Sequence, residues 1–141
     1  MIRRARLEDQ ELLTSLSAEF NEVDGHSHDD ARVRAALTPL LRDDGLGIVY
    51  LFGEPPIGYA VVTWGYSIES GGRDALLDEI YVRTQGQGLG GAAFEEILDD
   101  LRQRGLTRMF LETERPNSKV RSFYTRHGFE QDDSIWMSRQ L

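Results

Sequence analysis

Apolar residues recur at two different periods along the chain. Over the first forty residues the spacing is three to four, which predicts two amphipathic helices. One starts near Asp9, and the other follows a polar loop over residues 21–30. Pro39 is expected to kink the second helix or to start a new turn there. A short strand over residues 2–6 precedes both helices.

The middle of the chain changes to a strand pattern. Runs rich in β-branched and aromatic residues predict strands over 47–52, 57–67 and 75–82, separated by turns at 53–56 and 71–72. The first two of these strands should form a hairpin. After the glycines of 86–91 the helical period returns, and this helix is expected to end at Gly105.

In the last third of the chain, predicted strands and helices alternate. We expect a strand over 109–112, a helix capped by Ser118 and stopped by Gly128, and a final strand within 129–141. The order β-α-α-β-β-β-α-β-α-β predicts an α/β fold (α+β in some schemes): a mixed central sheet flanked by helices on both faces. Its middle strands should pair antiparallel, and the unit from 75 to 112 should form a right-handed parallel crossover.

Composition narrows the classes of function. The 141 residues suit one domain, 1–141, and the net charge of −8 argues against nucleic acid and anionic membrane surfaces as partners. The chain has no cysteine, which excludes disulfides, thiolate catalysis and Cys-ligated zinc. Neither a signal peptide nor a membrane span is evident, so we expect a cytoplasmic protein.

The segment 85–91 (Gln-Gly-Gln-Gly-Leu-Gly-Gly) carries the most chemistry, because it follows a predicted strand and opens a predicted helix. Unpaired N–H groups at a helix start suit a phosphate, and glycines let the backbone approach it closely. A tight turn without a ligand is the structural alternative. The spacing Gly86-x-Gly88-x-x-Gly91 also fits a dinucleotide fingerprint, but too little chain follows for a Rossmann domain, and no Walker sequence is present.

Gln85-x-x-Gly88-x-Gly90 resembles the acyl-CoA loop of the GNAT superfamily, the Gcn5-related N-acetyltransferases. Strand 77–82 and the spacing N-x6-Y-x3-GF, which begins at Asn117, are similar to further family motifs, and the likeness covers nearly the whole chain. It implies the GNAT fold and direct transfer of the acetyl group of acetyl-CoA to a primary amine through a ternary complex. Because Gln85 and Gln87 stand where basic residues are common, Arg83 is expected to supply the missing charge.

The resemblance also implies the cofactor-binding residues. Backbone groups of strand 80–82 would hold the pantetheine arm, the loop would hold the pyrophosphate, and the Asn117 amide would contact the cofactor. The full set is Ile80, Tyr81, Val82, Gln85, Gly86, Gln87, Gly88, Leu89, Gly90, Gly91, Asn117 and Tyr124. Asn117 alternatively serves only as a turn or cap residue.

Acetyl transfer also needs groups that move protons. By resemblance Tyr124 is the general acid that protonates the departing thiolate, although it could simply pack in the apolar stripe of its helix. Glu79 and Asp78 are the candidates for the base that takes the proton of the amine, with Glu79 preferred. Strand alternation would place these two on opposite faces, and a surface ion pair is the alternative for either.

The remaining expectations concern partners. His26 and His28 lack the spacing of a zinc motif, so we expect no metal and place their loop beside the acceptor. The acceptor is a small-molecule or peptide amine, and the resemblance makes a homodimer plausible. Two other hypotheses remain: a non-catalytic acyl-CoA-binding or regulatory domain with the same fold, and a Rossmann-type nucleotide-binding module.

Overall fold

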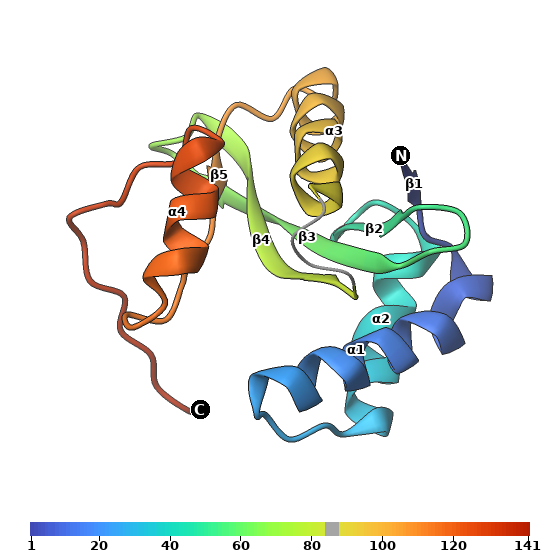
Figure 1. The fold of residues 1–141 in the computed structure, drawn as a ribbon. Coiled ribbons are helices and arrows are strands. Elements are labelled where there is room, and N and C mark those ends of the chain that lie inside the picture. The colour runs from blue at the N-terminus through green and yellow to red at the C-terminus, as the bar shows by residue number, and fades with distance from the viewer. Residues whose placement is uncertain (84–87) are drawn as a thin grey trace. The chain divides into compact units, whose positions relative to one another are not determined.

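A computed structural model describes residues 1–83 and 88–141 (Figure 1). By internal contacts the chain forms two compact units, Met1–Leu111 and Glu112–Leu141. The first holds the whole sheet and three of the four α-helices, and the second holds the remaining helix. Each unit is described by itself below.

The sheet of the first unit has five strands in the order in which they occur along the chain. All neighbours pair antiparallel except the last two, which are parallel. This confirms the predicted mixed sheet and the hairpin in its middle. The strands are β1 (Ile2–Arg4), β2 (Gly47–Phe52), β3 (Gly58–Ser67), β4 (Gly72–Val82) and β5 (Met109–Phe110).

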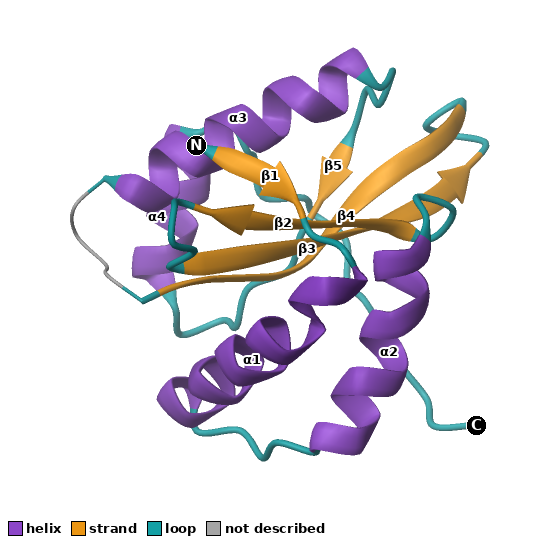
Figure 2. Cartoon of the chain, turned by 90° about the vertical axis from the view of Figure 1, so that its right-hand side faces the viewer, coloured by secondary structure: helices purple, strands orange, loops and turns teal. Residues whose placement is uncertain are grey.

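Helices lie on both faces of this sheet (Figure 2). On one face lie α1 (Gln10–Asp24), which follows the 3-10 turn η1 (Leu7–Asp9), and α2 (Asp30–Arg42). On the other lies α3 (Leu89–Gln103). The helix of the second unit is α4 (Ser118–Arg126). Gly105 and Gly128 follow α3 and α4 with positive φ, so both predicted stop positions are confirmed.

The main core lies between the sheet and the first two helices. Its buried side chains come from α1, α2, β2 and β3, and Ala5 joins them from the chain after β1: Ala5, Leu13, Leu16, Leu37, Leu41, Val49, Leu51, Tyr59 and Val61. The members on each strand alternate, as expected for one face of a sheet. Removal of this apolar surface from water is the main force that holds the two helices on the sheet.

Several predicted boundaries differ from the observed ones. The loop predicted over 21–30 is shorter, because α1 continues to Asp24 and α2 begins at Asp30. Pro39 lies inside α2, which continues through it to Arg42. Asn117, not Ser118, caps α4: its side-chain oxygen accepts a hydrogen bond from the Val120 amide at 3.2 Å.

The predicted final strand is wrong. Residues 129–141 contain neither helix nor strand, and the side chains of Ile135, Trp136 and Met137 are exposed. The apolar pattern there is compatible with a strand, but a strand needs a neighbour to complete its hydrogen bonds. Within the described residues this segment pairs with no strand.

Across 1–83 and 88–141 the chain holds no helix that is both long and apolar enough to cross a lipid bilayer.

The core position of Leu16 provides a test of this packing. Leu16 is fully buried on α1, so Leu16→Ala should lower the free energy of unfolding by about 2–5 kcal/mol. Val23 is 71% exposed on the same helix, and Val23→Ala should change that free energy by less than about 0.5 kcal/mol. Urea unfolding at equilibrium measures both values. Equal effects of the two substitutions would contradict the placement of α1.

Candidate active site

One edge of β4 is open along half of the strand. Towards β3 the strand pairs along its whole length, but towards β5 it pairs only at Ala75 and Leu76. Over residues 77–82 no described strand lies on that side. Backbone N–H and C=O groups that point there are therefore available to a ligand rather than to a ladder. Ile80, Tyr81 and Val82, predicted to bind the pantetheine arm, belong to this stretch.

The N-terminus of α3 begins shortly after this open edge. Gly88 is its N-cap in the left-handed conformation (φ 74°), and the first turn carries no acidic residue. In contrast, acidic residues stand in the first turns of α1 and α2. The positive end of α3 is thus not offset by a carboxylate of its own, which favours an anionic ligand. Of the predicted loop, Gly88, Leu89, Gly90 and Gly91 are described, while Gln85, Gly86 and Gln87 lie outside the described residues.

A β-bulge lies next to the open edge. Val61 pairs with Glu79 and Val62 with Leu77, so Asp78 is the extra residue on β4. The bulge breaks the regular alternation from which opposite faces were predicted for Asp78 and Glu79. Glu79 stays in register with Val61, whose side chain belongs to the core beneath α1 and α2.

The two candidate bases lie in different surroundings. Asp78 is an exposed residue, but its carboxyl group is partly shielded from water. This desolvation raises the pKa of Asp78. Glu79 is half-buried, and burial likewise raises its pKa, with a further rise from the Asp78 charge. A carboxyl group with a raised pKa is a stronger base when ionised, because its pKa lies closer to the pKa of the amine that it would deprotonate.

Sequence reasoning missed the closest partner of Glu79. The Tyr59 hydroxyl, from β3, donates a hydrogen bond to Glu79 Oε1 at 2.6 Å. Tyr59 lies opposite Tyr81 in the strand register, and Glu79 lies opposite Val61, so Tyr59 and Glu79 are diagonal neighbours on one face. No motif marks this pair, and only the register of β3 on β4, bulge included, reveals it.

The end of β4 is tied to α1. The Tyr81 ring stacks at 5.6 Å from Phe20, and its hydroxyl donates to Glu19 at 3.3 Å. Arg83 forms a forked ion pair with the same carboxylate, with contacts of 2.7 and 2.9 Å. Arg83 was expected to add positive charge to the glycine loop. Instead, its guanidinium is already engaged by Glu19.

In the second unit, Tyr124 is buried on α4. Phe123 and Phe129 pack edge-on against its ring, with ring centres 5.2 and 5.7 Å away. Desolvation raises the pKa of Tyr124 to about 12, so the phenol keeps its proton at neutral pH. Asn117 caps the same helix and uses its side-chain oxygen to do so. Asn117 thus acts as the helix cap that was its alternative role. Its contact with a cofactor remains a prediction.

The histidine loop between α1 and α2 is organised by hydrogen bonds. His28 Nδ1 lies 3.0 Å from the Asn21 amide and Nε2 lies 2.6 Å from Asp30 Oδ1. In the part of the chain that the structure describes, no group of three or more His, Asp or Glu side chains could hold a metal ion.

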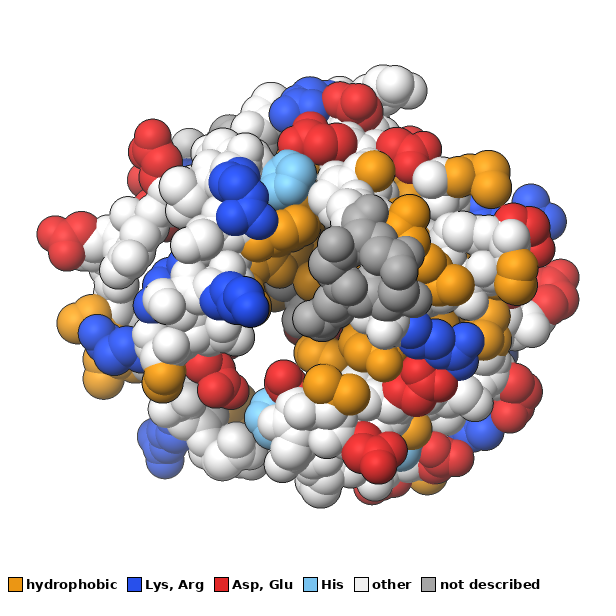
Figure 3. Space-filling model, viewed as in Figure 1, with side chains coloured by type: hydrophobic (Ala, Val, Ile, Leu, Met, Phe, Trp, Pro, Cys, Tyr) orange, Lys and Arg blue, Asp and Glu red, His pale blue; other side chains and the backbone are white. Residues whose placement is uncertain are grey.

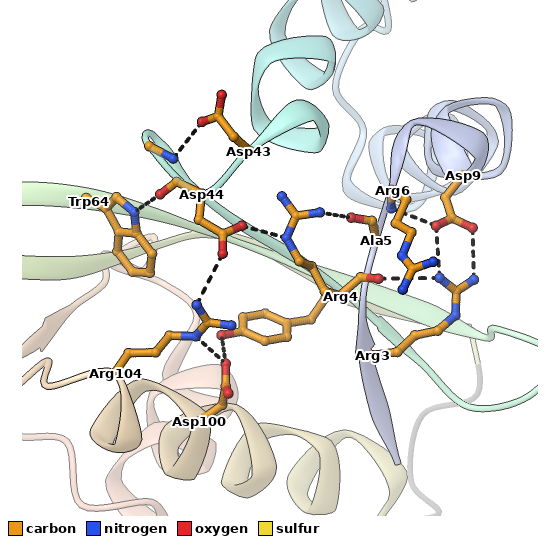
Figure 4. Close-up of polar contacts among 12 residues, drawn as sticks. Arg3, Arg4, Ala5, Arg6, Asp9, Asp43, Asp44, Trp64, Asp100 and Arg104 are labelled. Carbon is orange, nitrogen blue, oxygen red and sulfur yellow. Dashed lines mark hydrogen bonds and ion pairs between the residues drawn. The ribbon is translucent and has the colours of Figure 1, made fainter.

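A shallow recess of about 380 Å³ lies between β1, β2 and α3. Arg4 and Arg104 of its lining both pair with Asp44, at 2.5 and 3.3 Å, and Arg104 also pairs with Asp100 at 2.9 Å (Figure 4). The Tyr50 hydroxyl adds a hydrogen bond to Asp100 at 2.7 Å. This network joins α3 to the sheet and contains none of the predicted site residues.

The surface shows no large patch of one charge on the face drawn in Figure 3. Acidic side chains are spread over it, with Lys and Arg between them. The net charge of −8 therefore does not mark an acceptor site.

Comparisons with known proteins agree with this geometry. The model of the acetyltransferase (GNAT) family matches residues 10–129. A solved structure of a proposed acetyltransferase from Arthrobacter sp. FB24 superimposes with a TM-score of 0.88 at 27% identity, over 100% of this chain and 96% of the other. An integron cassette protein from the mobile metagenome of Cole Harbour Salt Marsh gives 0.87 at 29% identity, over 99% and 90%.

Two further relatives concern chemistry. A mycothiol acetyltransferase from Beutenbergia cavernae is 43% identical over 61 residues, which are 40% of this chain and only 20% of that protein. The matched segment of this chain therefore spans about a fifth of the length of that curated relative. A proposed acetyltransferase from Clostridium acetobutylicum, solved with acetyl-CoA, shares the fold with a TM-score of 0.82 at 18% identity, over 100% of this chain and 96% of the other.

The family match spans far more than half of the chain, and the sheet and helices agree with the fold of its relatives. The chain belongs to the GNAT family of acetyltransferases.

Proposed function

We propose that this protein transfers the acetyl group of acetyl-CoA directly to a primary amine within a ternary complex. The observation that carries the proposal is the open edge of β4 over residues 77–82, which is followed closely by the glycine-capped start of α3. An extended backbone with unpaired groups suits the amides of a pantetheine arm. A helix start without acidic residues suits a pyrophosphate.

The cofactor-binding residues in this proposal are those that the resemblance to the family implies. Ile80, Tyr81 and Val82 would bind the pantetheine arm through their backbone, and the segment 85–91 would bind the pyrophosphate through its N–H groups. Asn117 would contact the cofactor from the cap of α4. A β4 N–H that polarises the thioester carbonyl would contribute roughly 3 kcal/mol to stabilisation of the developing oxyanion.

The proposed reaction then has three parts. Glu79, acting through water, accepts a proton from the ammonium group, with Asp78 as the second candidate. The freed amine attacks the thioester carbon, and the tetrahedral intermediate collapses by breaking the carbon–sulfur bond. Tyr124 gives its proton to the departing thiolate, and the second proton that the acetylated nitrogen loses returns to the Tyr124 phenolate through water. Because burial raises the pKa of Tyr124 to about 12, the phenol is protonated at neutral pH and has a proton to give.

The acceptor class is supported less directly. The chain has no cysteine to carry a covalent acetyl group, which favours direct transfer. The Beutenbergia relative is named for mycothiol, but the match covers a fifth of that protein. We therefore propose a small-molecule or peptide amine. A single domain over 1–141, a homodimer and a cytoplasmic location remain predictions.

A thiol-release assay with acetyl-CoA distinguishes an enzyme from a non-catalytic acyl-CoA-binding domain. The acceptor panel contains spermidine, L-lysine, kanamycin and an alanyl peptide with a free N-terminus. We expect acceptor-dependent release with at least one of these amines. If acetyl-CoA raises the melting temperature but no amine releases thiol, the binding-domain hypothesis replaces the enzyme.

The glycine loop is tested by Gly88→Glu, which places a carboxylate where the pyrophosphate is proposed to bind. We expect this variant to lose most of the rise in melting temperature that acetyl-CoA causes in the wild type. Gly105→Glu is the matched control, because Gly105 has a similar φ (87°) and an equally open surrounding at the other end of α3. An unchanged response of Gly88→Glu to acetyl-CoA would show that the pyrophosphate binds elsewhere.

The acid role is tested by Tyr124→Phe, which removes the proton donor and keeps the ring. We expect kcat to fall by about 10²- to 10⁴-fold, while the shift in melting temperature caused by acetyl-CoA is retained. Tyr50→Phe removes another buried phenol that lies in the α3 network, and it should keep kcat within about threefold of the wild type. Turnover of Tyr124→Phe equal to that of this control would exclude Tyr124 as the acid.

A further inference from the structure

Tyr59 is a buried polar residue that the proposed reaction does not use. Its side chain is 2% exposed among the core residues beneath α1 and α2, and its hydroxyl donates to Glu79 Oε1 at 2.6 Å. Burial and the Glu79 charge raise the pKa of Tyr59 well above its usual value, and a hydrogen bond with Ser17 of α1 opposes this rise. The phenol therefore stays protonated and remains a donor to the carboxylate.

Tyr50 provides an internal comparison. It is also 2% exposed, lies on the adjacent strand β2, and donates to a carboxylate, that of Asp100, at 2.7 Å. Tyr59 lies opposite Leu51 in the strand register, and Leu51 is the residue next to Tyr50 on β2. Neighbouring residues of a strand point to opposite faces, so the two phenols lie on opposite faces of the sheet. Asp100 also pairs with Arg104, whereas the Tyr59 bond serves a carboxylate next to the open edge of β4.

Burial and three groups on the elements around Glu79 act on its pKa. Burial raises its pKa, the hydrogen bond from Tyr59 of β3 lowers it, the charge of Asp78 on β4 raises it, and His28 from the loop between α1 and α2 lowers it. Ser17 acts on Glu79 only through Tyr59. Among these groups, Tyr59 forms the direct hydrogen bond to the carboxylate.

We infer that Tyr59 is a positioning residue for the base of the acetyl transfer: its hydroxyl holds Oε1 of Glu79 and leaves Oε2 to accept the proton. The inference rests on the proposed function, in which Glu79 is that base. A hydrogen bond to the charged form of a carboxyl keeps it ionised at lower pH. Tyr59 thereby extends the pH range over which a desolvated Glu79 can act.

Tyr59→Phe and Tyr50→Phe form a matched pair for the test. Each removes one buried phenol that donates to a carboxylate, so both should lose stability in urea unfolding. Two further quantities separate them. One is the pH dependence of kcat/KM with acetyl-CoA and the fastest amine of the panel. The other is the titration midpoint of the Glu79 carboxyl carbon, measured by NMR in the absence of acceptor.

Tyr59→Phe is expected to move the acidic limb of kcat/KM and the Glu79 midpoint to higher pH together. On the acidic limb kcat/KM should fall by roughly three- to tenfold. Tyr50→Phe should move neither quantity. If Tyr59→Phe fails to fold, Ser17→Ala takes its place. Loss of the Ser17 hydrogen bond makes the Tyr59 hydroxyl a weaker donor, so the acidic limb and the Glu79 midpoint should both move to higher pH by a smaller amount.

The outcomes separate this inference from the function on which it rests. If the Glu79 midpoint in Tyr59→Phe equals that of the wild type, Tyr59 has only a structural role and the inference is wrong. If the midpoint moves while the limb of kcat/KM does not, the positioning role is overturned because Glu79 is not the base. Glu79→Gln gives the independent check, since it should abolish the acidic limb if Glu79 is the base.

Discussion

The edge of β4 that β5 leaves unpaired is the constraint on which the candidate site depends. A strand within a sheet has its backbone groups used on both sides, whereas β4 uses both sides only at Ala75 and Leu76. Beyond that point no strand of residues 1–83 and 88–141 pairs with this side of β4, so its donors and acceptors there are open to water or a ligand. The family's cofactor, with its chain of amides, is such a ligand. Ile80, Tyr81 and Val82, the candidates for binding the pantetheine arm, lie on this unpaired stretch of β4.

The bulge at Asp78 adds chemistry to this edge. An extra residue on β4 changes the phase of alternation, so Leu77 pairs with Val62 while Glu79 stays opposite Val61. Glu79 is thereby held on the face that carries Tyr59 and the core beneath α1 and α2. The energetic cost of a half-buried carboxylate is offset by the Tyr59 hydrogen bond. Burial in this fold thus raises the pKa of Glu79, and the hydrogen bond from Tyr59 limits that rise.

The opposite face of the sheet contains polar contacts of a different kind. There Asp44 pairs with Arg4 and Arg104, and Asp100 pairs with Arg104 (Figure 4). Paired charges of opposite sign on Asp44, Asp100 and Arg104 help to hold the helix α3 against the sheet. The contrast between the two faces is a reason to place the proton chemistry on the face of Glu79.

The sequence by itself determined the element order up to the last helix, the mixed sheet, the glycine stops at Gly105 and Gly128, and the family motifs, because these depend on local spacing and backbone preference. It failed at residues 129–141, where an apolar pattern predicts a strand but only a neighbouring strand could form one. The tertiary structure alone decided the bulge at Asp78, the Tyr59–Glu79 bond and the engagement of Arg83 by Glu19. Each of these depends on register or on contacts between residues distant along the chain, which no local pattern encodes.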